Sequence, residues 1–178
     1  MTPSSFVAGW VGQLSPRDGT QRALDVAMGR GRHALLVARA GFRTFGVDVK
    51  PEAVRDAMAA AAQEGLTIRG WCADLTMFPL PRAAFDVIVV TRYLQRDLFA
   101  SLRDAVRPGG WVIYETFTVR QRALGTGPTS PDHLLEPGEL CRRLDGWQIL
   151  FSEEVDAPEA VARLIARKPE TDHVERRT

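Results

Sequence analysis

The order of apolar and polar positions predicts strands and helices that alternate along the first two thirds of the chain. Apolar residues recur at helical spacing after Ser4 and Ser5, in segments 33–40 and 51–65, and after Leu98. Five short apolar runs are typical of strands, at residues 22–27, 44–49, 67–72, 85–90 and 111–117. This alternation predicts an α/β fold with a parallel sheet.

The pattern changes after the fifth strand. Residues 120–132 are rich in Gly, Pro, Ser and Thr and predict a long loop, and a short helix over 136–144 follows. Two late strands, 147–151 and 161–166, have no clear helix between them. We therefore expect them to pair as an antiparallel hairpin.

Composition and charge are those of an ordinary globular domain. The chain has 178 residues, of which 45% are hydrophobic and 25% charged, and its net charge is +1. This balance gives no electrostatic reason to expect a nucleic acid or an anionic membrane as a partner. We expect one domain over residues 1–168 and a polar, disordered tail over 169–178.

No segment resembles a signal peptide or a membrane-spanning helix, which needs about 18 apolar residues. The two cysteines, Cys72 and Cys141, fit no metal-binding spacing. We expect a cytoplasmic protein, a monomer or homodimer, that holds no metal.

The most informative segment is LDVAMGRGRH, residues 24–33, between the first strand and the next helix. Gly29 and Gly31 let the backbone approach a ligand closely, and the helix N-terminus offers unpaired N–H groups. Asp48 lies 19 residues after Gly29, at the end of the second strand, where a carboxylate can accept from two ribose hydroxyls. The same spacing also satisfies the degenerate dinucleotide fingerprint of NAD enzymes.

Three further features favour an adenosyl ligand that carries an amino acid. Asp25 lies inside the first strand, where a carboxylate suits an ammonium and is a poor neighbour for a pyrophosphate. Asp74 follows the third strand, where it can accept from an adenine amine. The segment RPGG, residues 107–110, leads into the fifth strand, and the hairpin follows.

In this order the motifs resemble those of class I methyltransferases that use S-adenosylmethionine (SAM). LDVAMGRGRHA is similar to the glycine-rich motif of that family, GVDV to its second-strand acidic motif, ADL to its adenine-side motif and RPGG to the turn before its fifth strand. The resemblance implies a Rossmann-like seven-stranded sheet, mostly parallel with one antiparallel strand from the C-terminal hairpin, and helices on both faces. It implies SAM as the cofactor.

The resemblance also implies which residues hold SAM. The expected cofactor-binding residues are Asp25, Ala27, Gly29 and Gly31 for the methionine part, Asp48 and Val49 for the ribose and adenine, Asp74 and Leu75 for the adenine, and Thr91, which closes the site. Turn capping is an alternative explanation of Asp74. Met28 stands where relatives often have Cys or Gly, and we expect it to pack under the cofactor.

The acceptor side is less clearly defined. The signatures of nucleic-acid amine and cytosine methylation are absent, which favours a small-molecule substrate. The candidate substrate-side residues are Arg92, Tyr93, Glu115, Arg120, Arg122 and His133. The arginines suit an anionic substrate, although a solvated loop face explains Arg120 and Arg122 as well. His33, in the first turn of its helix, is expected to make a surface or capping contact, and no catalytic base is assigned.

Within the family, residues 24–42 and the segment HLLEPGELCRRLDGW resemble the tellurite-resistance and thiopurine-methyltransferase-like group. That resemblance implies methyl transfer to a thiol, a hydroxyl or a metalloid oxyanion. The group carries basic or His residues near the last hairpin, whereas EEVDAPEA has none, which argues against a tellurite-type activity.

Two alternatives stay open. A non-catalytic SAM-binding sensor or scaffold predicts a pocket filled by side chains or a large exposed apolar patch. An NAD-dependent oxidoreductase predicts a substantial substrate-binding region after residue 117, where 61 residues remain.

Overall fold

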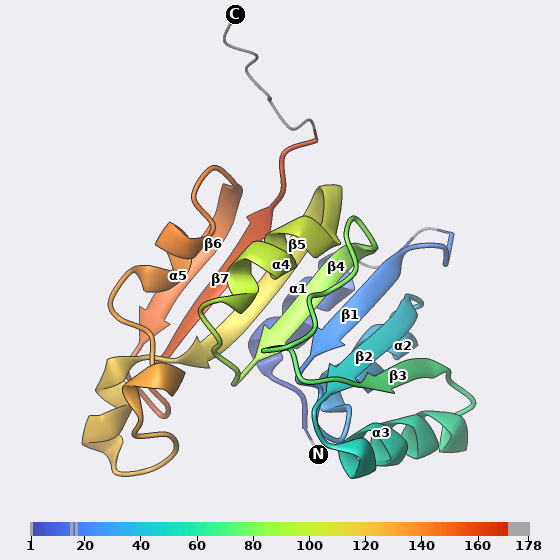
Figure 1. The fold of residues 1–178 in the computed structure, drawn as a ribbon, viewed down its shortest axis with the longest axis horizontal. Coiled ribbons are helices and arrows are strands. Elements are labelled where there is room, and N and C mark those ends of the chain that lie inside the picture. The colour runs from blue at the N-terminus through green and yellow to red at the C-terminus, as the bar shows by residue number, and fades with distance from the viewer. Residues whose placement is uncertain (1, 15, 17, 171–178) are drawn as a thin grey trace, which may run out of the picture.

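Seven strands form one sheet in the order β3-β2-β1-β4-β5-β7-β6 (Figure 1). The computed structural model describes residues 2–14, 16 and 18–170. β7 runs antiparallel to both β5 and β6, and the other paired strands are parallel, so the expected mostly parallel Rossmann-like sheet is confirmed. The strands are β1 (Arg22–Val26), β2 (Arg43–Asp48), β3 (Ile68–Cys72), β4 (Phe85–Thr91), β5 (Val106–Phe117), β6 (Gln148–Val155) and β7 (Val161–Arg167).

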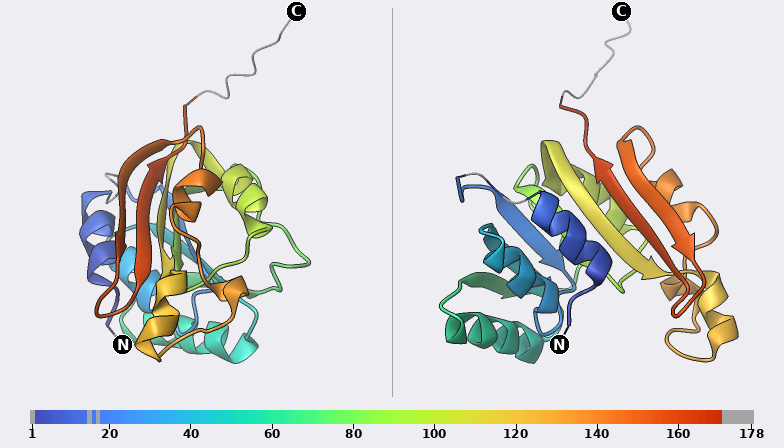
Figure 2. Two further views of the ribbon diagram at one scale, coloured as in Figure 1. Left: turned by 90° about the vertical axis from the view of Figure 1, so that its left-hand side faces the viewer. Right: turned by 180° about the vertical axis from the view of Figure 1, so that it is seen from behind.

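Helices cover both faces of the sheet (Figure 2). On one face lie α1 (Ser5–Gln13), α2 (Arg32–Arg39) and α3 (Pro51–Gln63), and on the other lie α4 (Leu98–Ala105) and α5 (Glu139–Arg143). The side chains of β4 alternate between these layers, because Val87 and Val89 pack with α1 and α2 while Ile88 and Val90 pack with α4. This explains the continuous apolar run FDVIVV.

Several boundaries differ from the sequence-based expectation. β5 begins at Val106 rather than at residue 111, so the segment RPGG belongs to the strand, next to a register shift opposite Phe85. The expected loop over 120–132 includes parts of two short 3-10 helices, Val119–Leu124 and Pro131–His133. The tail expected over 169–178 lies outside the described residues from position 171 onward.

An ion-pair cluster around the buried carboxylate of Glu139 holds the chain after β5 against the segment that precedes α4. The Arg96 guanidinium donates to both Glu139 oxygens at 2.8 and 2.9 Å, and to the Leu134 carbonyl at 2.9 Å. Glu139 also accepts from Arg143 and from the N–H of Glu136. Burial alone would raise the pKa of Glu139, but these donors lower it to about 2. The segment that follows β5 is therefore fixed in place by charge-assisted bonds.

We expect Gly31→Ala to destabilise the fold by about 2–4 kcal/mol, because the backbone is left-handed and the added carbon overpacks α3. The φ of Gly31 is +78°, and a Cβ there would lie 2.7 Å from the Cβ of Ala57. Gly65→Ala is the matched control, since Gly65 has a φ of +69° and open space around it. It should cost only about 1 kcal/mol. Urea unfolding measures both, and equal losses would show that the contact with Ala57 contributes nothing.

Candidate functional site

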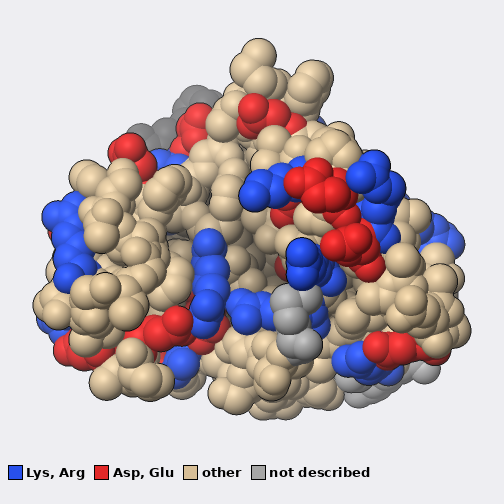
Figure 3. Space-filling model, turned by 90° about the horizontal axis from the view of Figure 1, so that it is seen from below, with Lys and Arg blue, Asp and Glu red and all other residues tan. Residues whose placement is uncertain are grey.

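The carboxyl ends of β1, β2, β4 and β5 meet at the lower edge of the sheet in Figure 1. The strand order reverses there, because β2 and β4 lie on opposite sides of β1. In open α/β sheets, ligands bind at such a reversal, outside the carboxyl ends of the strands. Figure 3 views the molecule from this edge and shows a hollowed middle bordered by basic and acidic side chains.

The turn between β1 and α2 is built from left-handed backbone. Ala27, Gly29 and Gly31 have φ values of 52°, 53° and 78°. A Cβ at Gly29 would meet nothing within 4 Å, whereas one at Gly31 would overlap Ala57 of α3. Gly31 therefore lets α3 pack closely, and Gly29 leaves open space in which a ligand can approach the backbone.

Asp25, in β1, is buried against the first turn of α2, and only 2% of its surface is exposed. Its Oδ2 accepts from the N–H of Ala34 at 2.9 Å, but its buried Oδ1 has no hydrogen-bond partner among the described residues. Burial raises the pKa of this carboxyl to about 7. An unpartnered buried oxygen costs about 1–3 kcal/mol, so a cationic donor from a ligand would be stabilised here.

Asp48 ties the end of β2 to the glycine turn. Its Oδ2 accepts from the N–H of Gly29 at 2.8 Å and its Oδ1 from the N–H of Lys50 at 2.9 Å. These two bonds fix the orientation of the carboxylate. Each oxygen keeps a lone pair that can accept from a ligand hydroxyl.

A pocket of about 280 Å³ opens beside Asp48. Its walls are mostly apolar, with two carboxylates, and Val49 is 58% exposed. Apolar walls with a few polar groups suit a flat ring with a polar sugar. We call it the nucleoside pocket; its lining is Ala27, Val47, Asp48, Val49, Ala73, Asp74, Leu75 and Tyr93.

Five of the expected cofactor-binding residues thus come together in the nucleoside pocket, and Tyr93, expected on the substrate side, joins them. Asp74 also caps a turn, because its Oδ1 accepts from the Thr76 hydroxyl and N–H at 2.7 and 2.9 Å, and these bonds lower its pKa. The Tyr93 hydroxyl donates to Gln95, which donates to the Leu75 carbonyl at 3.1 Å. Sequence reasoning missed Gln95, since no motif marks it.

Met28, expected to pack under the cofactor, lies beneath the turn rather than on the wall of the nucleoside pocket. It is buried in the cluster that α2 and α3 form on one face of the sheet, and it does not line the nucleoside pocket. A Cβ at Gly46 would lie 2.0 Å from the Met28 sulfur, and one at Gly70 would lie 3.2 Å from its Cε. Met28 therefore fills the space above two strand glycines.

A second, polar pocket of about 200 Å³ lies next to α2. The N-terminal segment 2–5 forms one wall, and five charged side chains line the rest: Arg32, Arg92, Glu115, Glu159 and Arg163. Arg92 donates to both oxygens of Glu159, at 2.9 and 2.6 Å, and Arg163 donates to Glu115 at 2.7 Å. The structure thus brings together two expected substrate-side residues, Arg92 and Glu115, but pairs each of them with an internal partner.

His33 was expected to make a surface or capping contact. It is not at the surface, because only 2% of the residue is exposed. Its Nε2 accepts from the N–H of Ser4 at 3.0 Å, which leaves Nδ1 to donate to the Thr91 hydroxyl at 3.0 Å. Burial and the nearby charges of Arg32 and Arg92 lower the pKa of His33 to about 4. Thr91 therefore contacts His33, and this neutral histidine anchors the N-terminal segment.

The other substrate-side candidates line neither pocket. Arg120 pairs with Asp156 at 2.9 Å, and both side chains are more than half exposed. Arg122 donates to the Thr129 carbonyl at 3.0 Å, and His133 is exposed. The solvated-loop explanation fits these arginines better than substrate binding.

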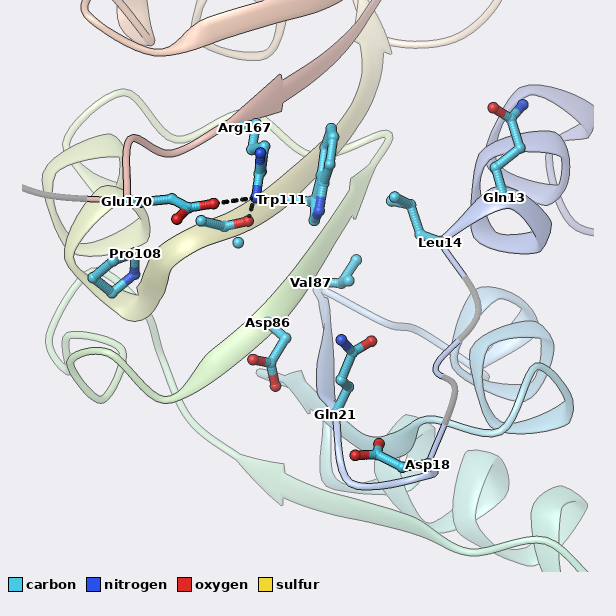
Figure 4. A pocket seen from close by; sticks show the side chains of 12 residues that line it. Gln13, Leu14, Asp18, Gln21, Asp86, Val87, Pro108, Trp111, Arg167 and Glu170 are labelled. Atoms are coloured by element: carbon cyan, nitrogen blue, oxygen red, sulfur yellow. Dashed lines mark hydrogen bonds and ion pairs between the residues drawn. The ribbon is translucent and has the colours of Figure 1, made fainter.

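A larger cavity, about 640 Å³, lies at the opposite edge of the sheet, near the amino ends of β1, β4 and β5 (Figure 4). Its charged groups already have internal partners. Asp86 accepts from Arg107 at 3.1 Å, and Arg167 donates to Glu170 at 2.6 Å and to the Gly109 carbonyl at 3.0 Å. Because this edge carries the amino ends of the parallel strands, we place the site at the other edge.

Within residues 2–14, 16 and 18–170, no three His, Cys, Asp or Glu side chains are grouped so that they could hold a metal ion. No helix there has the length and apolar character needed to cross a bilayer.

Comparison with known proteins agrees with this geometry. A family described as a methyltransferase domain matches residues 23–110, from β1 into β5. The match spans just under half of the chain, and it shows that this part of the chain is similar to methyltransferase domains. The matched segment contains the glycine turn, Asp48 and the whole nucleoside pocket.

The ubiquinone biosynthesis O-methyltransferase of Paracidovorax citrulli is 28% identical over 167 residues, covering 79% of this chain and 69% of that protein. Uncharacterized mycobacterial proteins are 35% identical over 68 residues, and the match spans 38% of this chain and a quarter of their length.

Among solved structures, the (4+2)-cyclase SpnF has a TM-score of 0.76 at 21% identity, covering 93% of this chain and 80% of that one. TehB from Haemophilus influenzae has a TM-score of 0.72 at 18% identity, covering 90% and 62%. These two structures share the fold.

We expect the unliganded protein to lose stability between pH 5 and pH 8 because of Asp25. Its folded pKa of about 7 lies above the ordinary value of 3.8 for an aspartate, so the folded state holds the extra proton and unfolding becomes easier as pH rises through this window. The loss should be about 3 kcal/mol. Urea unfolding of the wild type and Asp25→Asn at both pH values tests this. The same pH dependence in the variant would show that Asp25 does not cause it.

Proposed function

We propose that this protein transfers the methyl group of SAM to a small-molecule nucleophile. The observation that carries the proposal is the arrangement of a carboxylate and a pocket along the turn between β1 and α2. At its start lies Asp25, whose buried oxygen has no hydrogen-bond partner among the described residues, and beside it opens the nucleoside pocket. An ammonium acceptor and a nucleoside pocket joined by an open glycine turn match a ligand with an amino acid at one end and adenosine at the other.

In this proposal Asp25 accepts from the ammonium of SAM, and Gly29 allows the chain to lie close to the ligand. Asp48 accepts from the ribose hydroxyls, while Val49, Leu75 and Asp74 hold the adenine. Bound SAM supplies a methyl group on a positively charged sulfur. The protein residues contribute by holding the acceptor atom in line with that methyl, which can account for much of the rate enhancement.

A hydroxyl oxygen is the first acceptor to test. The ubiquinone biosynthesis relative is named for O-methyl transfer, and this supports an oxygen acceptor. The β6–β7 turn, residues 156–160, contains Asp, Ala, Pro and Glu but no His, Lys or Arg. This composition argues against a metalloid oxyanion.

The two alternatives have less support. An NAD enzyme would place a pyrophosphate at the glycine turn, where the buried carboxylate of Asp25 is a poor neighbour for it. A non-catalytic SAM-binding protein is favoured by one observation: Met77 and Phe78, close after Asp74, are 73% and 63% exposed. Against it, the nucleoside pocket is open rather than filled by side chains.

We expect calorimetry to show binding of SAM and S-adenosylhomocysteine with Kd values on the order of micromolar, and no binding of NAD. Asp48→Ala should weaken both adenosyl ligands at least about tenfold, because two hydroxyl contacts are lost. Asp132→Ala, an exposed carboxylate outside both pockets, is the control.

Transfer of labelled methyl from SAM to a panel of phenols, thiols and metalloid oxyanions then tests catalysis. Binding without transfer to any acceptor would favour the non-catalytic alternative, and binding of NAD alone would refute the proposal.

A further inference from the structure

Three arginines form a row across one face of the sheet. Arg22, Arg43 and Arg69 lie in β1, β2 and β3, which are adjacent strands. The register places Arg22 opposite Arg43, and it places Arg69 opposite Phe45. Side chains two residues apart in a strand share a face, so Arg43 lies on the face of Phe45. Arg22 and Arg69 lie there too, because their guanidinium carbons are 4.7 and 5.8 Å from the centroid of the Phe45 ring.

No helix of the described chain covers this part of the sheet. The helices of the same face, α4 and α5, lie over the other half, and in Figure 1 nothing helical lies in front of β2 and β3. Two aromatic side chains of this face, Phe45 and Trp71, are therefore only half-buried. We call the surface formed by Arg22, Arg43, Phe45, Arg69 and Trp71 the arginine face.

The three arginines have no acidic partner. Their side chains make no hydrogen bond or ion pair with any residue in 2–14, 16 or 18–170, and the buried Nε of Arg22 lacks a hydrogen-bond partner there. Like charges opposite each other destabilise a sheet, as Arg22 and Arg43 do here. An anionic ligand would remove this cost. Several arginines outside the arginine face are paired instead: Arg39 with Glu64 at 2.6 Å, Arg82 with Asp104 at 3.0 Å and Arg107 with Asp86 at 3.1 Å.

We propose that the arginine face binds single-stranded nucleic acid. Guanidinium groups bind phosphate oxygens through two parallel hydrogen bonds, and the half-buried rings of Phe45 and Trp71 offer a stacking surface to unpaired bases. Sheet faces that carry aromatic side chains bind single-stranded RNA in this way. An acidic peptide would use the charges but leave the rings unused, so it fits this surface less well.

The arginine face lies away from the site at the carboxyl edge. Arg22 and Arg43 are the first residues of β1 and β2, whereas the nucleoside pocket lies where these strands end. A nucleic acid and an adenosyl ligand can therefore bind together, and the inference does not rest on the proposed function. The net charge of +1 gives no sign of this surface, because only the folded sheet brings the three arginines together.

Fluorescence polarisation with labelled oligouridylate and oligothymidylate tests the inference. We expect Kd values on the order of 1–100 μM at low salt, and log Kd should rise with log salt with a slope of about 2, as three neutralised phosphates of a single strand give. The double variant Arg43→Gln/Arg69→Gln should weaken binding at least about tenfold, because two charge-assisted contacts are lost. Both side chains are exposed, so the variant should fold, which urea unfolding checks.

Arg30→Gln/Arg55→Gln is the matched control, since it removes the same charge from the side of the sheet that α3 covers. Arg55 lies in α3 and Arg30 pairs with Asp56 of that helix, and both arginines are exposed. This variant should leave the affinity for both oligonucleotides unchanged. Arg43→Lys/Arg69→Lys keeps the charge of the arginine face and should restore part of the affinity.

The inference is refuted if the wild-type protein binds neither oligonucleotide at low salt, or if both glutamine double variants weaken binding equally. Equal affinity for poly-glutamate or for a duplex would also refute it, since charge alone would then explain the binding. A variant Arg43→Gln/Arg69→Gln that loses stability but keeps its affinity would show that the arginines only cover the aromatic rings.

Tighter binding of one of the two oligonucleotides supports the inference and identifies RNA or DNA as the source of the ligand. Calorimetry with S-adenosylhomocysteine, run on the same proteins, separates this inference from the proposed function. Its affinity should be the same in the wild type and in Arg43→Gln/Arg69→Gln. Wild-type protein that binds oligonucleotides but no adenosyl ligand would refute the proposed function and leave the arginine face standing.

Discussion

The left-handed turn between β1 and α2 is the constraint on which the site depends. Within five residues the chain leaves the middle of the sheet and enters a helix. Position 31 in this reversal needs a glycine, because its backbone is left-handed and a side chain there would overlap α3. The N–H of Gly29 then binds Asp48 at the end of the neighbouring strand. One turn thereby sets the positions of Asp25, the nucleoside pocket and the polar pocket, although β2 and α3 lie farther along the chain.

Two buried carboxylates show how the same residue class serves structure or ligand binding. Glu139 accepts from two guanidinium groups and a backbone N–H, which lower its pKa to about 2. Asp25 has one backbone donor, and burial raises its pKa to about 7. A fully partnered carboxylate stabilises the fold, whereas a half-partnered one is a cost that a cationic ligand would remove. The site is therefore the place where internal hydrogen bonding is incomplete.

Local sequence determines much of this arrangement and explains which parts were predictable. The strands, the glycine turn and the residues at the strand ends follow from short motifs, because parallel strands bring their carboxyl ends to one edge. Contacts between distant segments could not be predicted. Arg92 and Tyr93 are adjacent yet line different pockets, with Arg92 in a left-handed conformation. The burial of His33 depends on Ser4, 29 residues away, and Arg120 is neutralised by Asp156, 36 residues away.

Fold likeness alone does not decide the chemistry, because the protein shares its architecture with a cyclase as well as with methyltransferases. The argument for function rests instead on charges. Near the carboxyl edge, Asp25 lacks a hydrogen-bond partner for one oxygen among the described residues, although it lines neither pocket. If this carboxylate accepts from the amino-acid end of the cofactor, the charges left near the polar pocket are mostly in internal pairs, Arg92 with Glu159 and Arg163 with Glu115. Acceptor choice would then depend on shape and on the segment after β5, which Arg96 and Glu139 hold in place.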